Sequence, residues 1–312
     1  MKGKPKLLLV TGIGRSGTTL LQGMLNAHSQ IYSPPETKYL KRFVIPEHYT
    51  PGSADLEAVK NRLRDSETLA RLGMDFERIL DKIRPGEKRP YLRFYQELML
   101  HSLQKEPSAR FFLDKDPLFI NFPAELHEIL PDAIMVQIVR DPRDVTLSRI
   151  KSTWGKDQHL LLHLFETKFG FENAEHLGIR YFKNRFTTIS YEDLVTNPKD
   201  TLQQLCNYLN IPFEAGMLQF HKQSDSILTE EEEGWKGNVR KPVMSDNINK
   251  WKNGLSSRQI HLIELVLDDK LKALDYETVT LNGTMSEKAS QWTLEVLYRL
   301  FKLLKNTKKK IG

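Results

Sequence analysis

"LVTGIGRSGTTLL", residues Leu9–Leu21, joins a short apolar run to a stretch with helical spacing through a glycine-rich turn. This order predicts a β-strand, a tight loop and an α-helix. Gly12 and Gly17 keep the glycine spacing of a phosphate-binding P-loop, but Thr18 stands where that loop has its lysine. The N–H groups at the helix start can still hold a phosphate, whereas the cation that reaches the β and γ phosphates of ATP is missing. A glycine turn that only caps the helix is the alternative.

Further strands are predicted downstream, each followed by a helical pattern. The apolar runs Arg110–Leu113, Ala133–Val139 and Phe186–Ser190 suit buried parallel strands. These repeated units predict an α/β fold with a P-loop-type parallel β-sheet flanked by helices. Residues 40–108 show helical periodicity without a strand of their own, which predicts a helical insertion. Because ligands bind at the carboxyl ends of parallel strands, we expect the polar residues after these strands to share one rim.

A second motif, VRDPRDVTLS at Val139–Ser148, follows one of these strands. Arg140 closes the strand, so its guanidinium is expected to point into the rim, where phosphate is the best-fitting bidentate partner. Ser148 falls on the following helix and can donate to the same anion. A surface cluster of Arg and Asp that caps this helix is the alternative.

Charge and cysteine content limit the class of protein. The chain has 312 residues and a net charge of +6, of which residues 285–312 supply most, with seven basic and two acidic residues. The first 284 residues are almost neutral, which excludes the broad basic face of a nucleic-acid binder. The single Cys206 forms no intramolecular disulfide, and no apolar run reaches the length of about 18 residues that a spanning helix needs. The sequence therefore predicts a cytoplasmic protein.

Residues 285–312 predict a basic amphipathic helix that follows a main domain of residues 1–284. Trp292 and Leu300 fall on its apolar side, and Lys288 and Arg299 fall on its polar side. Two roles stay open for this tail: packing on the domain or on a second subunit, and peripheral contact with an anionic membrane surface. A non-catalytic membrane- or protein-docking module is the function that the tail alone suits.

The two motifs together resemble the sulfotransferases that use 3′-phosphoadenosine 5′-phosphosulfate (PAPS) as donor. GRSGTTLL is similar to the loop that holds the 5′-phosphosulfate in that family, and VRDPRDVTLS to the site of the 3′-phosphate. The donor has no β or γ phosphate, so the family explains the missing lysine. "GRSGTTLLQGMLNAHSQIYSPPETKYL", LDKDP, ISYEDLVTNP and RKPVMSDNINKW further resemble, in this order, the tyrosylprotein sulfotransferase branch. The resemblance covers most of Leu7–Leu274.

The resemblance assigns roles residue by residue. Glu36, in the triplet Glu36-Thr37-Lys38, corresponds to the general base that takes the proton of the acceptor hydroxyl, and Arg15 and Lys115 would stabilise the transferring sulfuryl group and the leaving phosphate. Ser16, Gly17, Thr18 and Thr19 would hold the 5′-phosphate, and Arg140, Ser148, Tyr191 and Lys241 the 3′-phosphate. No metal is expected, and 3′,5′-diphosphoadenosine (PAP) would be the product.

The residues alone leave plainer interpretations of these sites open. Glu36 also suits a surface position after two prolines, Lys115 an ion-pair cluster, and Tyr191 a core position. Lys38 stands where the branch has arginine, and the chain has neither the membrane anchor nor the disulfides of the animal enzymes. The acceptor is therefore left open among a glycan, a lipid or small-molecule alcohol, and a peptide tyrosine.

A P-loop phosphotransferase or kinase-like enzyme is the second enzymatic hypothesis. It predicts binding of ATP with Mg²⁺, whereas a sulfotransferase is expected to bind PAP without a metal ion.

Overall fold

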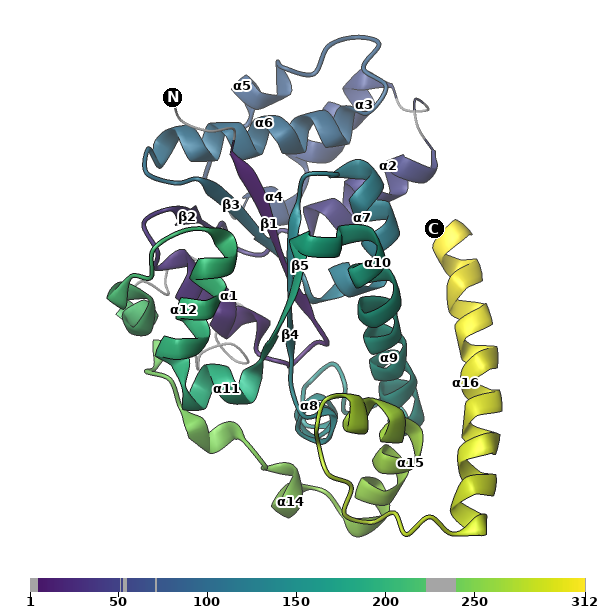
Figure 1. Cartoon of the computed structure of the whole chain (residues 1–312). Helices are drawn as coiled ribbons and strands as arrows, with labels where there is room; N and C mark the ends of the chain where they lie inside the picture. The colour runs from purple at the N-terminus through teal and green to yellow at the C-terminus, as the bar shows by residue number, and fades with distance from the viewer. Residues whose placement is uncertain (1–4, 51, 53–54, 71, 223–239, 312) are drawn as a thin grey trace.

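The computed structural model describes residues 5–50, 52, 55–70, 72–222 and 240–311 (Figure 1). Within them, five parallel strands form one sheet in the order β2-β3-β1-β4-β5. The strands are β1 (Lys6–Gly12), β2 (Ile31–Tyr32), β3 (Phe111–Lys115), β4 (Ile134–Val139) and β5 (Phe186–Ser190). The predicted α/β fold is confirmed. Only β2, at the edge, was not predicted, because two residues carry no recognisable period.

The strand order gives the carboxyl end of β1 a special position. Leu8 of β1 pairs with Leu113 of β3 on one side and with Ile134 of β4 on the other. The chain first runs from β1 to β2 and β3, and then crosses to β4 and β5 on the opposite side. The connections after β1 therefore diverge, which creates the kind of opening where α/β proteins bind ligands.

Alternate residues of β1 enter two different apolar cores. Leu8 and Val10 pack with α1 (Thr18–Asn26), α11 (Tyr191–Thr196) and α12 (Pro198–Leu209). Leu7 and Leu9 face the other core, which the helices between β2 and β3 complete together with α7 (Pro123–Ile129). Figure 1 shows α1, α11 and α12 to the left of the sheet and α7 to the right. A parallel sheet needs this cover because both of its faces are apolar.

In its described residues, the chain between β2 and β3 contains helices joined by loops and no strand, as predicted for residues 40–108. It contains the π-helix η1 (Leu40–Val44), α2 (Ile45–Tyr49), α3 (Leu56–Arg64), α4 (Glu67–Ala70), α5 (Glu77–Leu80) and α6 (Pro90–Lys105). The buried carboxylate of Glu47 joins α2 to α6, because it accepts the N–H groups of Tyr91 and Leu92 at 2.9 Å each. This region therefore forms a fixed wall beside β3.

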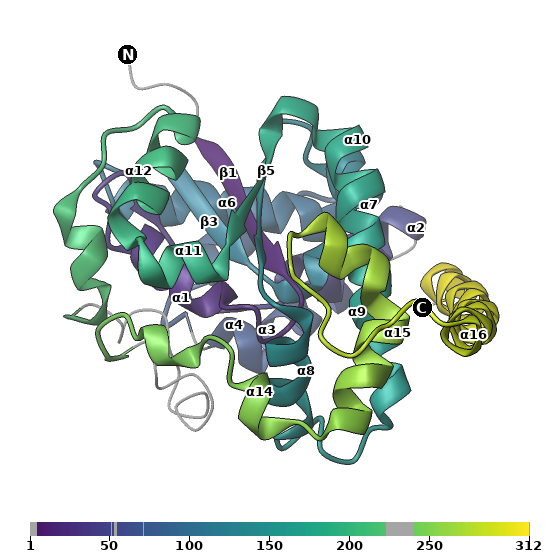
Figure 2. The same cartoon turned by 60° about the horizontal axis from the view of Figure 1, so that its bottom comes forward.

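The second half of the chain surrounds α8 (Pro142–Ile150), which follows β4. With the lower end of the molecule turned forward, α14 (Trp251–Gly254) and α15 (Ser257–Ala273) lie on either side of α8 (Figure 2). Ser256 caps α15 in a capping box with Gln259. The other elements are η2 (Pro117–Asn121), α9 (Leu160–Glu172), η3 (Asn173–Gly178), α10 (Ile179–Phe182), η4 (Lys183–Arg185), η5 (Ala215–Lys222), η9 (Ser245–Asn247) and α16 (Met285–Ile311).

The predicted C-terminal helix is α16, and it packs on the rest of the protein. Leu294, Tyr298 and Phe301 join an apolar cluster with residues of α9 and α15. Two of these three residues are aromatic, and their rings reach Phe165 of α9 with centroid distances of 5.6 and 5.7 Å. None of the described helices is both long and apolar enough to cross a membrane.

Candidate active site

The loop between β1 and α1 has the backbone of a phosphate cradle. Arg15 and Gly17 both adopt positive φ angles, 83° and 102°. Gly17 immediately precedes α1, so the N–H groups of Thr18 and Thr19 belong to the first helical turn, where the helix offers no partner. The Ser16 hydroxyl donates to the carbonyl oxygen of Ile13 inside the loop. The end of β1 therefore presents a helix N-terminus, the usual site for a phosphate.

Gly17 is required at its position for a second reason. A Cβ atom there would lie 2.5 Å from the ring of Tyr191, the first residue of α11. The Tyr191 ring is buried, and the guanidinium of Arg140 stacks on it at 4.5 Å. Burial also raises the pKa of the Tyr191 hydroxyl. Loop, tyrosine and arginine therefore form one packed unit, and Tyr191 is more than a core residue.

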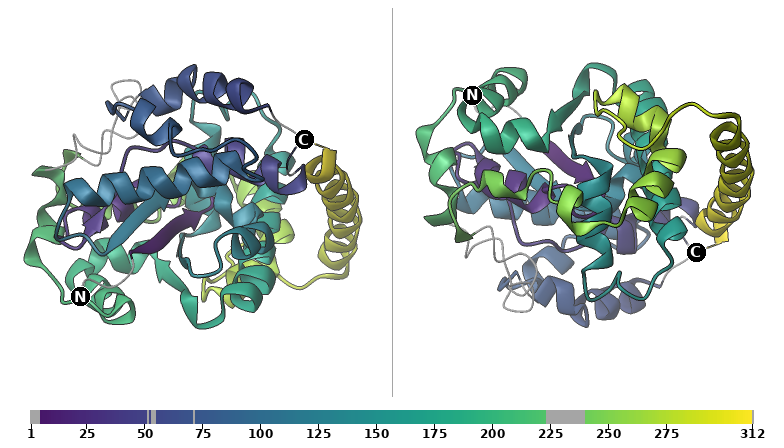
Figure 3. Two further views of the ribbon diagram at one scale, coloured as in Figure 1. Left: turned by 90° about the horizontal axis from the view of Figure 1, so that it is seen from above. Right: turned by 90° about the horizontal axis from the view of Figure 1, so that it is seen from below.

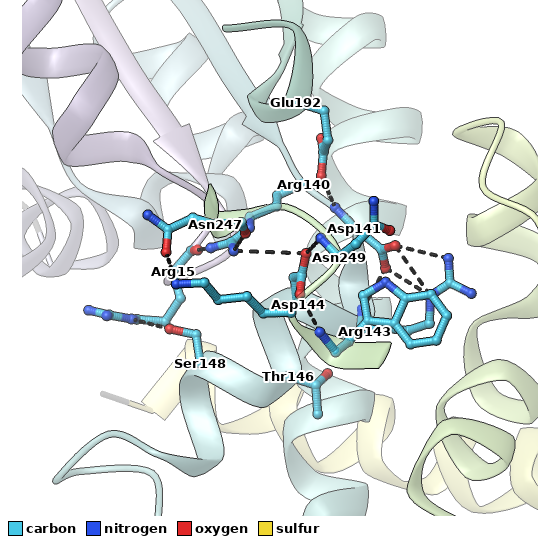
Figure 4. A network of polar contacts seen from close by, with 12 residues as sticks. Arg15, Arg140, Asp141, Arg143, Asp144, Thr146, Ser148, Glu192, Asn247 and Asn249 are labelled. Carbon is cyan, nitrogen blue, oxygen red and sulfur yellow. Dashed lines mark hydrogen bonds and ion pairs between the residues drawn. The ribbon is translucent and has the colours of Figure 1, made fainter. Parts of the chain in front are cut away.

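The two predicted phosphate motifs meet directly. Arg15 Nε donates to Ser148 Oγ at 3.0 Å, and an Nη atom of Arg140 donates to the carbonyl oxygen of Arg15 at 3.1 Å (Figure 4). Burial, with the charge of Arg140 as the second cause, lowers the pKa of Arg15. Arg140 Nε is buried, and no partner for it is found among the described residues. This corner concentrates positive charge, of which the carboxylate of Asp144, 3.9 Å from Arg140, balances a part.

A later segment closes this corner, and sequence reasoning did not identify its anchor. The carboxylate of Asp144 on α8 accepts the N–H groups of Asn249 and Trp251 at 2.8 Å each. The second Nη atom of Arg140 donates to the carbonyl oxygen of Asn247 at 2.6 Å. Asp144 is buried four residues after Arg140, and that spacing within the motif was the available signal.

Glu36 and Lys115 are in direct contact at the other part of the site. Lys115 Nζ donates to the carboxylate of Glu36, and the two side chains are 1% and 8% exposed. Lys115 ends β3, whereas Glu36 lies in the loop after β2, so parallel pairing of these strands brings them together. Glu36 is therefore not the surface residue that its prolines allowed.

Buried polar residues hold the loop that carries Glu36, and no sequence pattern had singled them out. Gln22 of α1 donates through Nε2 to Ser33 Oγ at 2.9 Å and to the carbonyl oxygen of Pro34 at 3.1 Å. The side chain of Asn26 accepts the N–H of Ser33 at 2.8 Å. Because Gln22 and Ser33 are almost fully buried, these hydrogen bonds fix the start of the loop against α1.

Two further carboxyl groups flank Lys115. Asp114 is buried, and burial, together with the charges of Asp116 and Glu36, raises its pKa to about 7 although Tyr95 donates to it at 2.8 Å. Burial also raises the pKa of Asp116, with Glu36 as the next cause. Lys115 therefore forms an ion pair with Glu36 and lies near two further acidic side chains, Asp114 and Asp116.

These residues surround a cavity of about 1490 Å³. The predicted site residues on its wall are Arg15, Gly17, Thr18, Thr19, Glu36, Lys115, Arg140, Ser148 and Tyr191. Ser16 is buried behind the loop, and Lys241 is exposed next to Pro242, which does line the cavity. Contact of Lys241 with a nucleotide therefore stays a prediction. Within the described ranges, no group of three or more His, Cys, Asp or Glu residues is placed to hold a metal ion.

The P-loop without lysine and the arginine motif line the same cavity. Comparison with known proteins shows which family the chain belongs to. A profile of the sulfotransferase family matches residues 6–215. The chain belongs to the sulfotransferase family. The chain is 26% identical over 258 residues to protein-tyrosine sulfotransferase from Drosophila melanogaster and 22% identical over 263 residues to protein-tyrosine sulfotransferase 1 from Danio rerio. Both alignments cover 78% of this chain, which spans 46% and 65% of those relatives.

Comparison with solved structures supports the fold of this chain. The sulfotransferase domain of the Synechococcus PCC 7002 olefin synthase is similar with a TM-score of 0.63 and 22% identity, covering 89% of this chain and 97% of that domain. The predicted family and its resemblance to the tyrosylprotein branch are therefore confirmed, and the structural likeness extends beyond the segment that the family profile matches.

Proposed function

We propose that this chain transfers a sulfuryl group from PAPS to the hydroxyl of an acceptor and releases PAP. One observation carries the proposal: a single cavity contains a phosphate loop without lysine, an incompletely paired arginine and a shielded carboxylate in contact with lysine. Membership of the sulfotransferase family supports it.

The residues fit the two ends of such a donor. The N-terminus of α1 suits a 5′-phosphate, because its N–H groups and dipole favour an anion and need no lysine. Arg140 suits a 3′-phosphate, because its buried Nε lacks a partner in the described part of the chain and its other donors reach only backbone oxygens and, at 3.9 Å, Asp144. The donor supplies an activated sulfuryl group, whose bond to the 5′-phosphate oxygen breaks as the acceptor oxygen attaches.

The protein residues then have separate tasks. Glu36 takes the proton of the acceptor hydroxyl onto its carboxylate, which makes the oxygen nucleophilic. Lys115 orients that carboxylate and places a cation beside the reacting group, and Arg15 places a second cation at the phosphate loop. Because the wall is buried, these charges act more strongly than they would in water.

The proposal also covers the catalytic unit, the cellular compartment and the class of acceptor. Residues 1–284 form the catalytic unit, and the reaction takes place in the cytoplasm. The acceptor hydroxyl belongs to a glycan, a lipid or small-molecule alcohol, or a peptide tyrosine, and similarity to protein-tyrosine sulfotransferases supports the last of these. A contact through α16 with a membrane or a second copy is separate from this chemistry.

Transfer of a labelled group tests the proposal. The full chain is incubated with sulfur-labelled PAPS and a panel of hydroxyl acceptors, and in parallel with γ-labelled ATP and Mg²⁺. We expect label from PAPS in an acceptor, and PAP in equal amount, without added metal. Label from ATP alone would instead support the phosphotransferase and contradict the proposal.

A further inference from the structure

The helix α16 packs on the protein through one side only. Tyr298 is 1% exposed, and its hydroxyl donates to Glu172 of α9 at 2.9 Å. Lys302 donates to the same carboxylate at 2.8 Å, and Glu295 accepts from Lys168 at 3.1 Å. The inner side of α16 therefore combines an apolar contact with ion pairs, and part of the predicted polar line faces the protein.

The outer side of α16 is apolar and faces solvent. Its exposed fractions are 71% for Trp292, 40% for Val296, 44% for Leu297, 54% for Leu300, 64% for Leu303 and 67% for Leu304. These positions recur at three- and four-residue spacing, so they share one face. Figure 3 shows α16 at the edge of the molecule in both views, with other helices on one side of it only. A helix that is apolar on both sides normally has a partner on both sides.

The charges of the tail indicate what that partner is. Residues 285–312 contain seven basic and two acidic residues. Glu295 pairs with Lys168 and with Arg299, Lys302 pairs with Glu172, and Lys305 lies 3.8 Å from Glu166. Basic residues still outnumber acidic ones in the tail when these paired residues are left out. A second copy related by a two-fold axis would place this positive tail against itself. An anionic bilayer instead offers an apolar interior and opposite charge.

We propose that the outer face of α16 binds the surface of an anionic phospholipid bilayer, with the helix lying in the plane of the interface. Trp292, Leu300 and Leu303 enter the boundary between head groups and acyl chains, and the basic residues beside them contact the phosphates. The docked protein keeps its cavity near the lipid, because Lys305 of the same helix lines that cavity and lies 3.8 Å from Glu166. This inference does not depend on the reaction proposed above.

Sedimentation with vesicles tests the proposal on the full chain. Vesicles of phosphatidylcholine mixed with phosphatidylserine are compared with vesicles of phosphatidylcholine alone. We expect wild-type protein to bind the mixed vesicles more tightly, and Leu300→Glu to weaken that binding by about tenfold or more, since the substitution places a charge in an apolar contact. Removal of residues 285–312 is a poor test, because it would also uncover the apolar cluster around Tyr298.

Matched variants separate the proposal from other causes. Ile179→Glu adds the same charge at an exposed apolar position on α10, where the side chain is 55% exposed, and should leave vesicle binding unchanged. Trp292→Ala removes an interfacial aromatic without adding charge and should weaken binding less. Unchanged melting temperature and PAP binding would show that the variants are folded. Equal sedimentation of wild type and Leu300→Glu, or a dimer in analytical ultracentrifugation that Leu300→Glu dissociates, would overturn the bilayer assignment.

Discussion

The cavity has a cation at each of two ends, Arg140 at one and Lys115 at the other, and the two differ in how they are paired. Arg140 donates to the backbone oxygens of Arg15 and Asn247, and the carboxylate of Asp144 lies 3.9 Å from it, beyond hydrogen-bond distance. Lys115 contacts the carboxylate of Glu36 directly, so these two charges balance each other. The first arrangement suits an anion that is present throughout the reaction. The pair of Lys115 and Glu36 suits charge that develops only while the acceptor hydroxyl gives up its proton, because a cation and a proton acceptor already lie side by side.

The largest effect should come from a substitution at the end of the cavity where Glu36 and Lys115 pair. Glu36→Gln keeps the size of the side chain but removes the proton acceptor, so turnover should fall by about 10²–10⁴-fold. Binding of PAP should change little, because Glu36 is assigned to the acceptor side. Steady-state kinetics and calorimetry measure the two quantities separately. Turnover at the wild-type rate would remove Glu36 from the mechanism.

At the Arg140 end of the cavity, one added methyl group in the phosphate loop should weaken nucleotide binding. Gly17→Ala combines a positive φ angle of 102° with a Cβ atom 2.5 Å from the Tyr191 ring, so the stack of Tyr191 and Arg140 must shift. We expect weaker PAP binding and a loss of about 1–3 kcal/mol in unfolding free energy. Gly14→Ala is the matched control in the same loop, since nothing lies within 4 Å of its added Cβ. Equal behaviour of the two variants would argue against the packed unit.

The third test concerns the pH dependence of stability, at the end of the cavity where Glu36 and Lys115 pair. The pKa of Asp114 is raised to about 7 in the folded protein, mainly by burial, against about 3.9 in an unfolded chain. Between these values the folded state keeps a proton that the unfolded state has released, so stability should fall as pH rises from about 4 to about 7. Asp114→Asn stays neutral and can still accept from Tyr95, so its urea unfolding should lack this part of the slope. Parallel stability profiles for both proteins would contradict the raised pKa.

The parts of the site that lie directly after strands could be predicted from the sequence. Arg140 and Lys115 end or follow buried strands, and parallel strands bring their carboxyl ends to one edge, so proximity follows once the strands are recognised. The contact of Arg15 with Ser148 follows from the same rule. Glu36 needed the family resemblance, because its loop follows β2, which is too short to predict.

The other parts of the site and of α16 could not be predicted, because they depend on the orientation that each side chain takes in the folded protein. Gln22 is a polar residue in an apolar helix, and only the folded loop shows what it bonds. Lys241 was assigned from a short motif, and a neighbour, Pro242, lines the cavity instead. In α16 the amphipathic pattern was visible, but Tyr298 pairs an apolar ring with a hydroxyl that reaches Glu172, so the packed side differs from the predicted apolar side.

Calorimetric titration with PAP and with 5′-AMP tests the central claim most directly, because these two nucleotides differ only in the 3′-phosphate assigned to Arg140. Wild-type protein should bind PAP about 10- to 100-fold more tightly than 5′-AMP, as one charge-assisted contact with an arginine allows. In Arg140→Ala this preference should disappear while the weaker 5′-AMP affinity stays nearly the same. A wild-type protein that does not distinguish the two nucleotides, or an Arg140→Ala variant that still prefers PAP, would contradict the account.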